Sequence, residues 1–223
     1  MKLFWLSVIL LISACSVSKN PMRNEVRRLQ KGITKDDTSY IYALPYEEGK
    51  SYYLVQGYFS SFTHKERAAL DFKMRRGTKI CATREGIVVR LKEDGDRGGL
   101  KKKYRPYGNY VIIQHADSSR AGYWHLQKDG VLVKVGDHVK KGQAIAISGK
   151  TGYTIIPHLH FLVWSSDLKG QWRQIGTRFQ TSKGIKYLRP LRKYRNLKTL
   201  SAPANPGPST HIPDILRVLI RSE

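Results

Sequence analysis

The sequence is short of cysteine, of acidic residues and of long apolar runs. Its 223 residues include 2 cysteines, Cys15 and Cys81, so the cysteine clusters that hold structural zinc are excluded. The apolar stretch from Leu3 to Ala14 has only about 12 residues, whereas a helix that crosses a bilayer needs roughly 20. This stretch is therefore too short to act as a membrane-spanning helix.

The N-terminus instead has the pattern of an export signal. Met1 and Lys2 precede the apolar run, which has the length and flank of a signal peptide. The following residues, Ile12-Ser13-Ala14-Cys15, resemble the lipobox of bacterial lipoproteins. The resemblance implies cleavage before Cys15, lipidation of Cys15 and a lipid-anchored location in the cell envelope, on the periplasmic face of the outer membrane because Ser16 follows. An ordinary secretory signal and an uncleaved anchor are the alternatives.

Acidic residues are outnumbered, since 17 Asp and Glu stand against 40 Lys and Arg, for a formal net charge of +23. A charge of this size attracts polyanions. An exported protein meets anionic envelope polymers, such as lipopolysaccharide, anionic lipid or carboxylate-bearing murein, rather than nucleic acid. Nucleic acid is also disfavoured because neither a recognition helix nor a stacking-aromatic motif is evident. A generally basic protein without any polyanionic partner is the remaining alternative.

Short apolar strands separated by glycine turns dominate the middle of the chain. Strands are predicted at 52–55, 79–82, 86–89, 110–113, 131–133, 144–147 and 159–163. Many short strands of this kind predict an all-β fold, an antiparallel sheet or sandwich. We expect a signal peptide at 1–14, a polar tether without clear periodicity at 15–40, the β domain at 41–196, and a proline-rich linker with a short amphipathic helix at 197–223. Loops at 92–107 and 165–185 are expected to wall an open groove.

Histidines in this domain are placed at suggestive spacings. His158 and His160 flank Leu159 inside an apolar run, so in a strand both imidazoles project from one face. Two buried imidazoles are costly unless a metal ion or hydrogen bonds satisfy them. His64 and Asp71 form a second piece, and His125 forms a third. Imidazole and carboxylate are ligands that Zn²⁺ prefers, although Asp71 could equally serve a structural ion pair.

The surrounding motifs resemble the lysostaphin/LytM-type peptidases of family M23. They are His64-x6-Asp71, Tyr123-Trp124-His125-Leu126 and Pro157-His158-Leu159-His160-Phe161. The similarity runs from about Gln56 to Trp164. It implies a LytM-like, barrel-sandwich-hybrid β fold with a groove, one Zn²⁺ held by three side chains, two catalytic histidines, and peptidoglycan as substrate. The implied ligands are His64, Asp71 and His160, and the implied catalytic residues are His125 and His158.

The resemblance further implies hydrolysis of peptide cross-links or stem peptides by a zinc-activated water, assisted by His125 or His158. A non-catalytic murein-binding envelope protein that activates another cell-wall hydrolase is the main alternative. The segment Val131 to Gly149 also resembles the hairpin of biotinyl and lipoyl carrier domains. Lys140 and Lys141 lack the sequence context of a modified lysine, however, and such carriers have no use for five placed histidines and acids.

Overall fold

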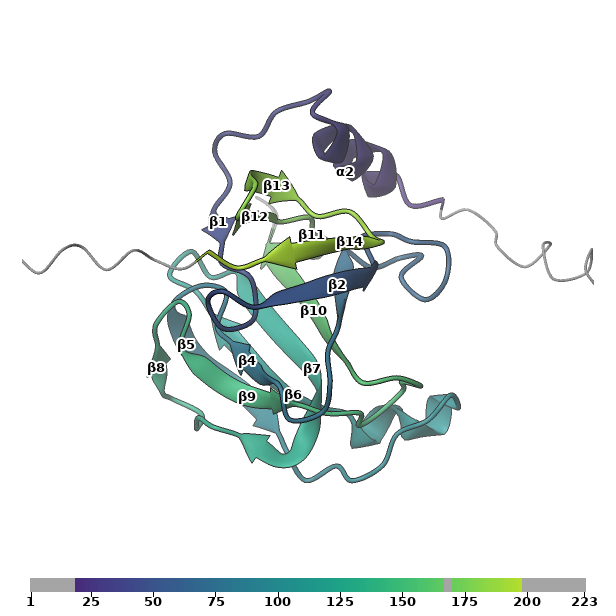
Figure 1. Cartoon of the computed structure of the whole chain (residues 1–223), viewed down its shortest axis with the longest axis vertical. Coiled ribbons are helices and arrows are strands. Elements are labelled where there is room, and N and C mark those ends of the chain that lie inside the picture. Colours follow the sequence, from purple (N-terminus) through teal and green to yellow (C-terminus); the bar gives the residue numbers. More distant parts are fainter. Residues whose placement is uncertain (1–18, 167–169, 198–223) are drawn as a thin grey trace, which may run out of the picture.

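The computed structural model describes residues 19–166 and 170–197 (Figure 1). The predicted signal peptide, the lipobox with Cys15 and the amphipathic helix after residue 197 lie outside the described residues. Among those described, no helix has both the length and the apolar character needed to cross a bilayer.

The described chain is built mainly from antiparallel strands. The elements in chain order are α2 (Met22–Lys31), β1 (Ile41–Tyr42), β2 (Ser51–Gln56), β3 (Ala69–Lys73), β4 (Lys79–Cys81), β5 (Gly86–Lys92), the 3₁₀ helix η1 (Lys102–Tyr107), β6 (Asn109–Gln114), β7 (Arg120–Val131), β8 (His138–Val139), β9 (Ala144–Ser148), β10 (His158–Ser166), β11 (Trp172–Ile175), β12 (Arg178–Thr181), β13 (Gly184–Tyr187) and β14 (Arg192–Arg195). The predicted all-β fold class is confirmed.

Most strands join one sheet whose main path runs β14-β2-β3-β10-β7-β6-β5-β8, while β4, β9 and β11 attach beside it. Strand β10 lies between β3 and β7 and is buried along its first six residues. Strand β6 alternates buried and half-buried residues, as expected where one face packs on the core. The core includes Phe72, Tyr123 and Phe161, and burial of each such side chain stabilises the fold by about 1.5–3 kcal/mol.

A smaller sheet of three strands, in the order β1-β12-β13, lies near α2 (Figure 1). Strand β1 runs parallel to β12, and this pair is the exception to the antiparallel pattern among the described strands. Strands β11 to β14 occupy the region 172–195, part of which the sequence analysis assigned to a groove-forming loop. The residues of β11, β13 and β14 are mostly exposed and lack the apolar alternation that predicts a strand, so tertiary pairing rather than local pattern forms these three strands.

Residues 22–31, which the sequence analysis assigned to a polar tether, form α2 and dock on the domain. Val26 is buried and packs against Gly176. At the end of the helix, Gln30 Nε2 donates to the Leu188 carbonyl at 2.5 Å, and Gly32 takes a left-handed conformation with φ of 71°, as a helix C-cap requires. The single apolar stripe of Met22, Val26 and Leu29 is the helical signal within this basic segment.

Candidate metal centre

The predicted metal ligands meet because of strand register. Antiparallel pairing of β3 with β10 places Asp71 directly opposite His160, and opposed side chains on one face of a sheet are close neighbours. His160 Nδ1 lies 2.8 Å from Asp71 Oδ1. His64, on the segment between β2 and β3, brings its Nε2 within 3.2 Å of Asp71 Oδ2. The three predicted ligands therefore form one cluster of buried side chains.

The inner hydrogen bonds of His64 select the nitrogen that faces this cluster. Its Nδ1 lies 3.2 Å from the Gly57 carbonyl and 3.0 Å from the Ala69 carbonyl, so it donates as Nδ1–H and leaves Nε2 as the lone-pair nitrogen. Backbone carbonyls commonly fix the tautomer and orientation of metal-binding histidines in this way. These backbone hydrogen bonds therefore orient Nε2 of His64 as the atom available to a metal ion.

Asp71 is a buried carboxylate whose ion-pair partners in the described chain are all imidazoles, namely His64, His158 and His160. Burial by itself would raise the pKa of Asp71, but the hydrogen bonds and charges of His160 and His64 outweigh it and hold the pKa well below its usual value. Burial lowers the pKa of His160, although Asp71 opposes this. A buried carboxylate surrounded by imidazole nitrogens is a donor set that a metal cation completes.

These donors fit Zn²⁺. Tetrahedral ligand atoms about 2.0–2.1 Å from zinc lie roughly 3.3 Å from one another, and one ligand atom from each of the three side chains lies within 4.8 Å of the others. Two imidazoles and one carboxylate are also a donor set that zinc accepts. His64, Asp71 and His160 are the residues that would hold the ion.

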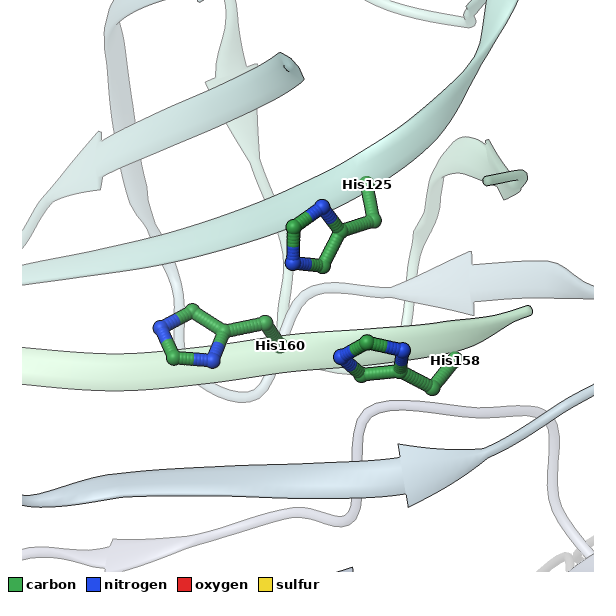
Figure 2. A group of neighbouring side chains, drawn as sticks. All are labelled: His125, His158 and His160. Carbon is green, nitrogen blue, oxygen red and sulfur yellow. The ribbon is translucent and has the colours of Figure 1, made fainter. Parts of the chain in front are cut away.

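The two predicted catalytic histidines lie beside the ligands, and Figure 2 shows His125, His158 and His160 with their rings directed toward a common region. One nitrogen from each of these three side chains lies within 4.8 Å of the others. The ring centroids of His125 and His158 are 4.7 Å apart. His158 Nε2 also lies 3.6 Å from Asp71 Oδ1, so all five predicted residues share one site.

His125 owes its orientation to an irregularity in the sheet. Asn109 pairs with Leu126 and Tyr110 pairs with Trp124, which leaves His125 as the additional residue of a β-bulge. Its φ of 64° lies in the left-handed region, which is strained for most residues other than glycine. Bulges re-aim side chains and are frequent beside active sites. Here the bulge turns the imidazole toward His158 and His160.

Backbone carbonyls anchor both catalytic candidates. His125 Nδ1 donates to the Thr151 carbonyl at 2.7 Å, and His158 Nδ1 donates to the Ile156 carbonyl at 2.9 Å. Each ring is thereby left with Nε2 as its basic nitrogen. Burial, followed by the nearby His158 and His160, lowers the pKa of His125 to about 3. His125 is therefore a neutral imidazole at pH 7, able to accept a proton or a hydrogen bond.

The site lies in a cleft of about 620 Å³. Leu100 and Arg105 line it from the predicted 92–107 loop, and Gln174 lines it from the predicted 165–185 loop. Two further segments, 62–67 and 153–156, also contribute and were not predicted as walls. Much of the apolar lining is aromatic and comes from Phe62, Trp124, Tyr153 and Trp164.

Sequence reasoning missed the residues that support the histidines. Thr151 Oγ1 accepts from the Asn109 N–H at 3.0 Å and donates to the Leu126 carbonyl at 2.7 Å, which ties the segment carrying the His125 anchor to β6 and β7. Thr154 Oγ1 lies 3.1 Å from His158 Nδ1. Asn109 and Thr151 fall within the stretch from about Gln56 to Trp164 that resembles family M23, and that resemblance is the signal through which they could have been found.

The other histidines of the described residues, and Cys81, lie away from the cluster. His115 is buried, and its Nδ1 donates to the Glu85 carbonyl at 2.7 Å, in keeping with a structural role. His138 is exposed on β8. Cys81 is buried and free, and burial raises the pKa of its thiol to about 11, so it behaves as a small apolar side chain.

Comparison with known proteins places this site in a family. The model of peptidase family M23 matches residues 65–172. Peptidoglycan DD-endopeptidase ShyA of Vibrio cholerae is 40% identical over 92 residues, which cover 41% of this chain and 18% of ShyA. Lysostaphin of Staphylococcus simulans is 39% identical over 92 residues, which cover 41% of this chain and 17% of lysostaphin. The chain thus spans about a fifth of the length of these curated relatives.

Among solved structures, the catalytic domain of the antimicrobial peptidase lysostaphin from Staphylococcus simulans is 32% identical to this chain. The match covers 54% of this chain and 85% of that domain, with a TM-score of 0.39. On the match to the family model and the sequence agreement with these curated peptidases, the chain belongs to peptidase family M23.

Proposed function

We propose that this protein is a zinc-dependent endopeptidase that hydrolyses peptide cross-links or stem peptides of bacterial peptidoglycan. The observation that carries the proposal is the convergence of His64, Asp71 and His160 beside His125 and His158 in one cleft. Family membership adds support, since relatives are named as a peptidoglycan DD-endopeptidase and as lysostaphin.

A zinc ion held by His64, Asp71 and His160 would supply Lewis acidity, polarising the scissile carbonyl and lowering the pKa of water toward about 7. The protein supplies the proton-handling groups. Nε2 of His125 and Nε2 of His158 are the free nitrogens, because both Nδ1 atoms donate to carbonyls. One of these imidazoles accepts a proton from the attacking water at Nε2, and the Nε2–H that forms then donates a hydrogen bond to the oxyanion. A positioned acid–base group of this kind contributes about 10²–10⁴-fold.

The cleft also fits a peptide that carries free carboxylates. Its aromatic and aliphatic lining excludes water from the backbone of an extended chain, and its cations are Arg67 and Arg105. Both arginines are exposed, so their guanidinium groups are available for bidentate pairing with carboxylates. Stem peptides of peptidoglycan, with their terminal and side-chain carboxylates, have this chemistry.

The decisive experiment combines metal analysis with digestion. The purified chain is assayed for zinc and incubated with murein sacculi, and the released muropeptides are identified by mass spectrometry. New termini at one kind of peptide bond are expected, with loss of release after chelation and recovery on addition of Zn²⁺. Unchanged muropeptides despite bound zinc would contradict the proposal and favour the murein-binding activator.

We also propose that Cys15 anchors the protein in the envelope, on the strength of the lipobox resemblance alone. Envelope attachment would keep the cleft beside its insoluble substrate. Fractionation of cells that express Cys15→Ser tests this, because the variant is expected to leave the membrane fraction. Retention of the variant with the membrane would rule out lipidation of Cys15 as the anchor.

A further inference from the structure

A second cleft, of about 850 Å³, is lined by the end of α2, by the segment that follows it, and by residues of β13 and β14. Figure 1 shows where these elements lie in the fold. The lining of this cleft contains nine lysines and arginines and only two aspartates. Among the described residues, none lines both this cleft and the one that holds the histidines. We call it the basic cleft.

The positive charge of the basic cleft is not consumed within the described chain. None of its nine cations takes part in the ion pairs formed by residues 19–166 and 170–197. The Asp36 carboxylate is engaged by local donors, the Ser39 backbone N–H at 2.9 Å and the Tyr187 hydroxyl. With nine cations against two carboxylates, the lining carries a clear excess of positive charge.

Two of the cations, Arg178 and Arg189, donate to backbone carbonyls, and seven others are available to a ligand. The buried Arg178 donates through Nε to the Ser39 carbonyl at 2.8 Å, so its charge is a permanent part of the cleft. The other eight cations are exposed, among them Lys186 and Arg192. Long, exposed Lys and Arg side chains adapt to the spacing of anions along a ligand, while the fixed charge of Arg178 raises the potential that they share.

The shape of the surface favours a chain-like ligand over a flat one. Cations come from two sides, Lys31 and Lys35 at the α2 side and Lys183 and Lys186 around β13, so they enclose a trough. Along β14, alternate residues such as Lys193 and Arg195 repeat at about 6.6 Å. A planar bilayer would contact one side of such a trough, whereas an extended polymer contacts both.

We propose that the basic cleft is a binding site for a linear polyanion with closely spaced phosphate or carboxylate groups. The site is separate from the proposed hydrolysis and does not depend on it. Part of the net charge of +23 is thereby assigned to a defined surface, the basic cleft. Its affinity is expected to fall steeply as salt rises, because binding releases the counterions of the polymer.

The test measures binding of the full chain, purified in nonionic detergent, to two probes at several salt concentrations. Linear inorganic polyphosphate represents phosphate groups, and poly-glutamate represents carboxylates. The test variant is the triple substitution Lys183→Gln, Lys186→Gln and Arg192→Gln. The matched control is Lys128→Gln, Lys134→Gln and Lys140→Gln, which removes the same charge from exposed positions that line neither cleft.

The test variant is expected to lose about tenfold or more in affinity for at least one probe, and to show a shallower salt dependence, because three contacts and their counterions are lost. The control is expected to change by less than about threefold, through net charge alone. The probe that binds more tightly identifies whether phosphate or carboxylate is the preferred group. Unchanged thermal midpoints in both variants exclude unfolding as the cause.

Three outcomes would overturn the proposal. Equal losses of affinity in the two triple variants would show that net charge, and not the basic cleft, governs binding. Absence of binding to both polymers would show that linear polyanions are not ligands of this protein. Binding to phosphatidylglycerol vesicles through the same three cations, without binding to either polymer, would assign the surface to a membrane instead.

Discussion

The two clefts of this protein differ in where the sheet places them. The metal centre draws on β3, β7 and β10, which are adjacent in the large sheet and fix their side chains by pairing on both sides. The basic cleft draws on α2, on β13 and on β14, at the periphery. Catalysis requires side chains that are positioned to within tenths of an ångström, and these lie at the centre of the sheet. Electrostatic binding of a charged ligand does not require such precision, so long and exposed side chains suffice for it.

The largest expected effect follows from removing a ligand at the sheet centre. His160→Ala is expected to lose zinc and to abolish digestion of sacculi, because it removes the donor that lies opposite Asp71. The loss in metal affinity is expected to exceed the roughly 10–100-fold cost of deleting an outer partner of a ligand. Zinc analysis after dialysis and muropeptide release measure the two effects. Polyphosphate binding in the same variant is expected to remain, and its loss would mean that the clefts are coupled.

The next effect separates catalysis from metal binding. His125→Asn is expected to retain zinc and to lower kcat by about 10²–10⁴-fold. Asparagine is preferred to alanine as the main test because it tolerates the left-handed backbone that His125 adopts, with φ of 64°. His125→Ala serves as the comparison and is expected to show the same catalytic loss. Full activity of either variant would show that the assigned role of His125 is wrong.

A smaller effect on kcat is expected from Thr151, which supports the segment that anchors His125. Thr151→Val keeps the side-chain shape but removes a hydroxyl that joins Asn109 to Leu126, so the free energy of unfolding is expected to fall by about 1–3 kcal/mol. Displacement of the His125 anchor is expected to lower kcat by roughly tenfold while zinc content stays constant. Urea titration and steady-state kinetics measure the pair of effects. Loss of stability with an unchanged kcat would leave Thr151 with a purely structural role.

The smallest effect lies outside both clefts and provides a baseline. Burial alone would raise the pKa of Asp117, but hydrogen bonds from Ser119 and Arg84 outweigh it and lower the pKa to about 2. Because the folded pKa is the lower one, this stabilisation is present above about pH 4 and is lost as the pH falls toward 2. Asp117→Asn is expected to cost less than about 1 kcal/mol at pH 7, since exposure to solvent weakens the pair.

Denaturation of both forms between pH 2 and 7 measures this contribution. The variant is expected to show a flatter decline than the parent between about pH 4 and pH 2, because it has no carboxylate to protonate there. An identical acid profile would show that the contact of 2.7 Å between Arg84 and Asp117 contributes nothing in solution. Zinc content and polyphosphate binding are expected to be unaffected, which makes the variant a control for the other three.

The parts of the molecule that the sequence predicted are those in which local pattern and function coincide. The all-β class follows from apolar strands and glycine turns, and the pair His158 and His160 follows from two-residue periodicity. The grouping of His64 and Asp71 with His160 came from resemblance to a family, because no local rule relates positions 89 residues apart, as Asp71 and His160 are.

The parts that the sequence did not predict depend on tertiary contacts. The bulge at His125 arises from a register shift between β6 and β7, which local preference does not encode. Strand β14 is polar and forms because β2 offers an edge to pair with. The basic cleft brings residues 29–37 together with residues 178–195. Because these two segments are far apart in the sequence, the sequence alone does not show that their charges form one cluster.

Strand β2 connects the two clefts. Ser51, at its start, borders the basic cleft, whereas Val55 and Gln56, at its end, border the cleft that holds the histidines. Four residues of extended backbone amount to about 13 Å. Because β2 is paired on one side with β14 and on the other with β3, a polyanion bound in the basic cleft would lie at a fixed separation from the histidines, whatever substrate occupies their cleft.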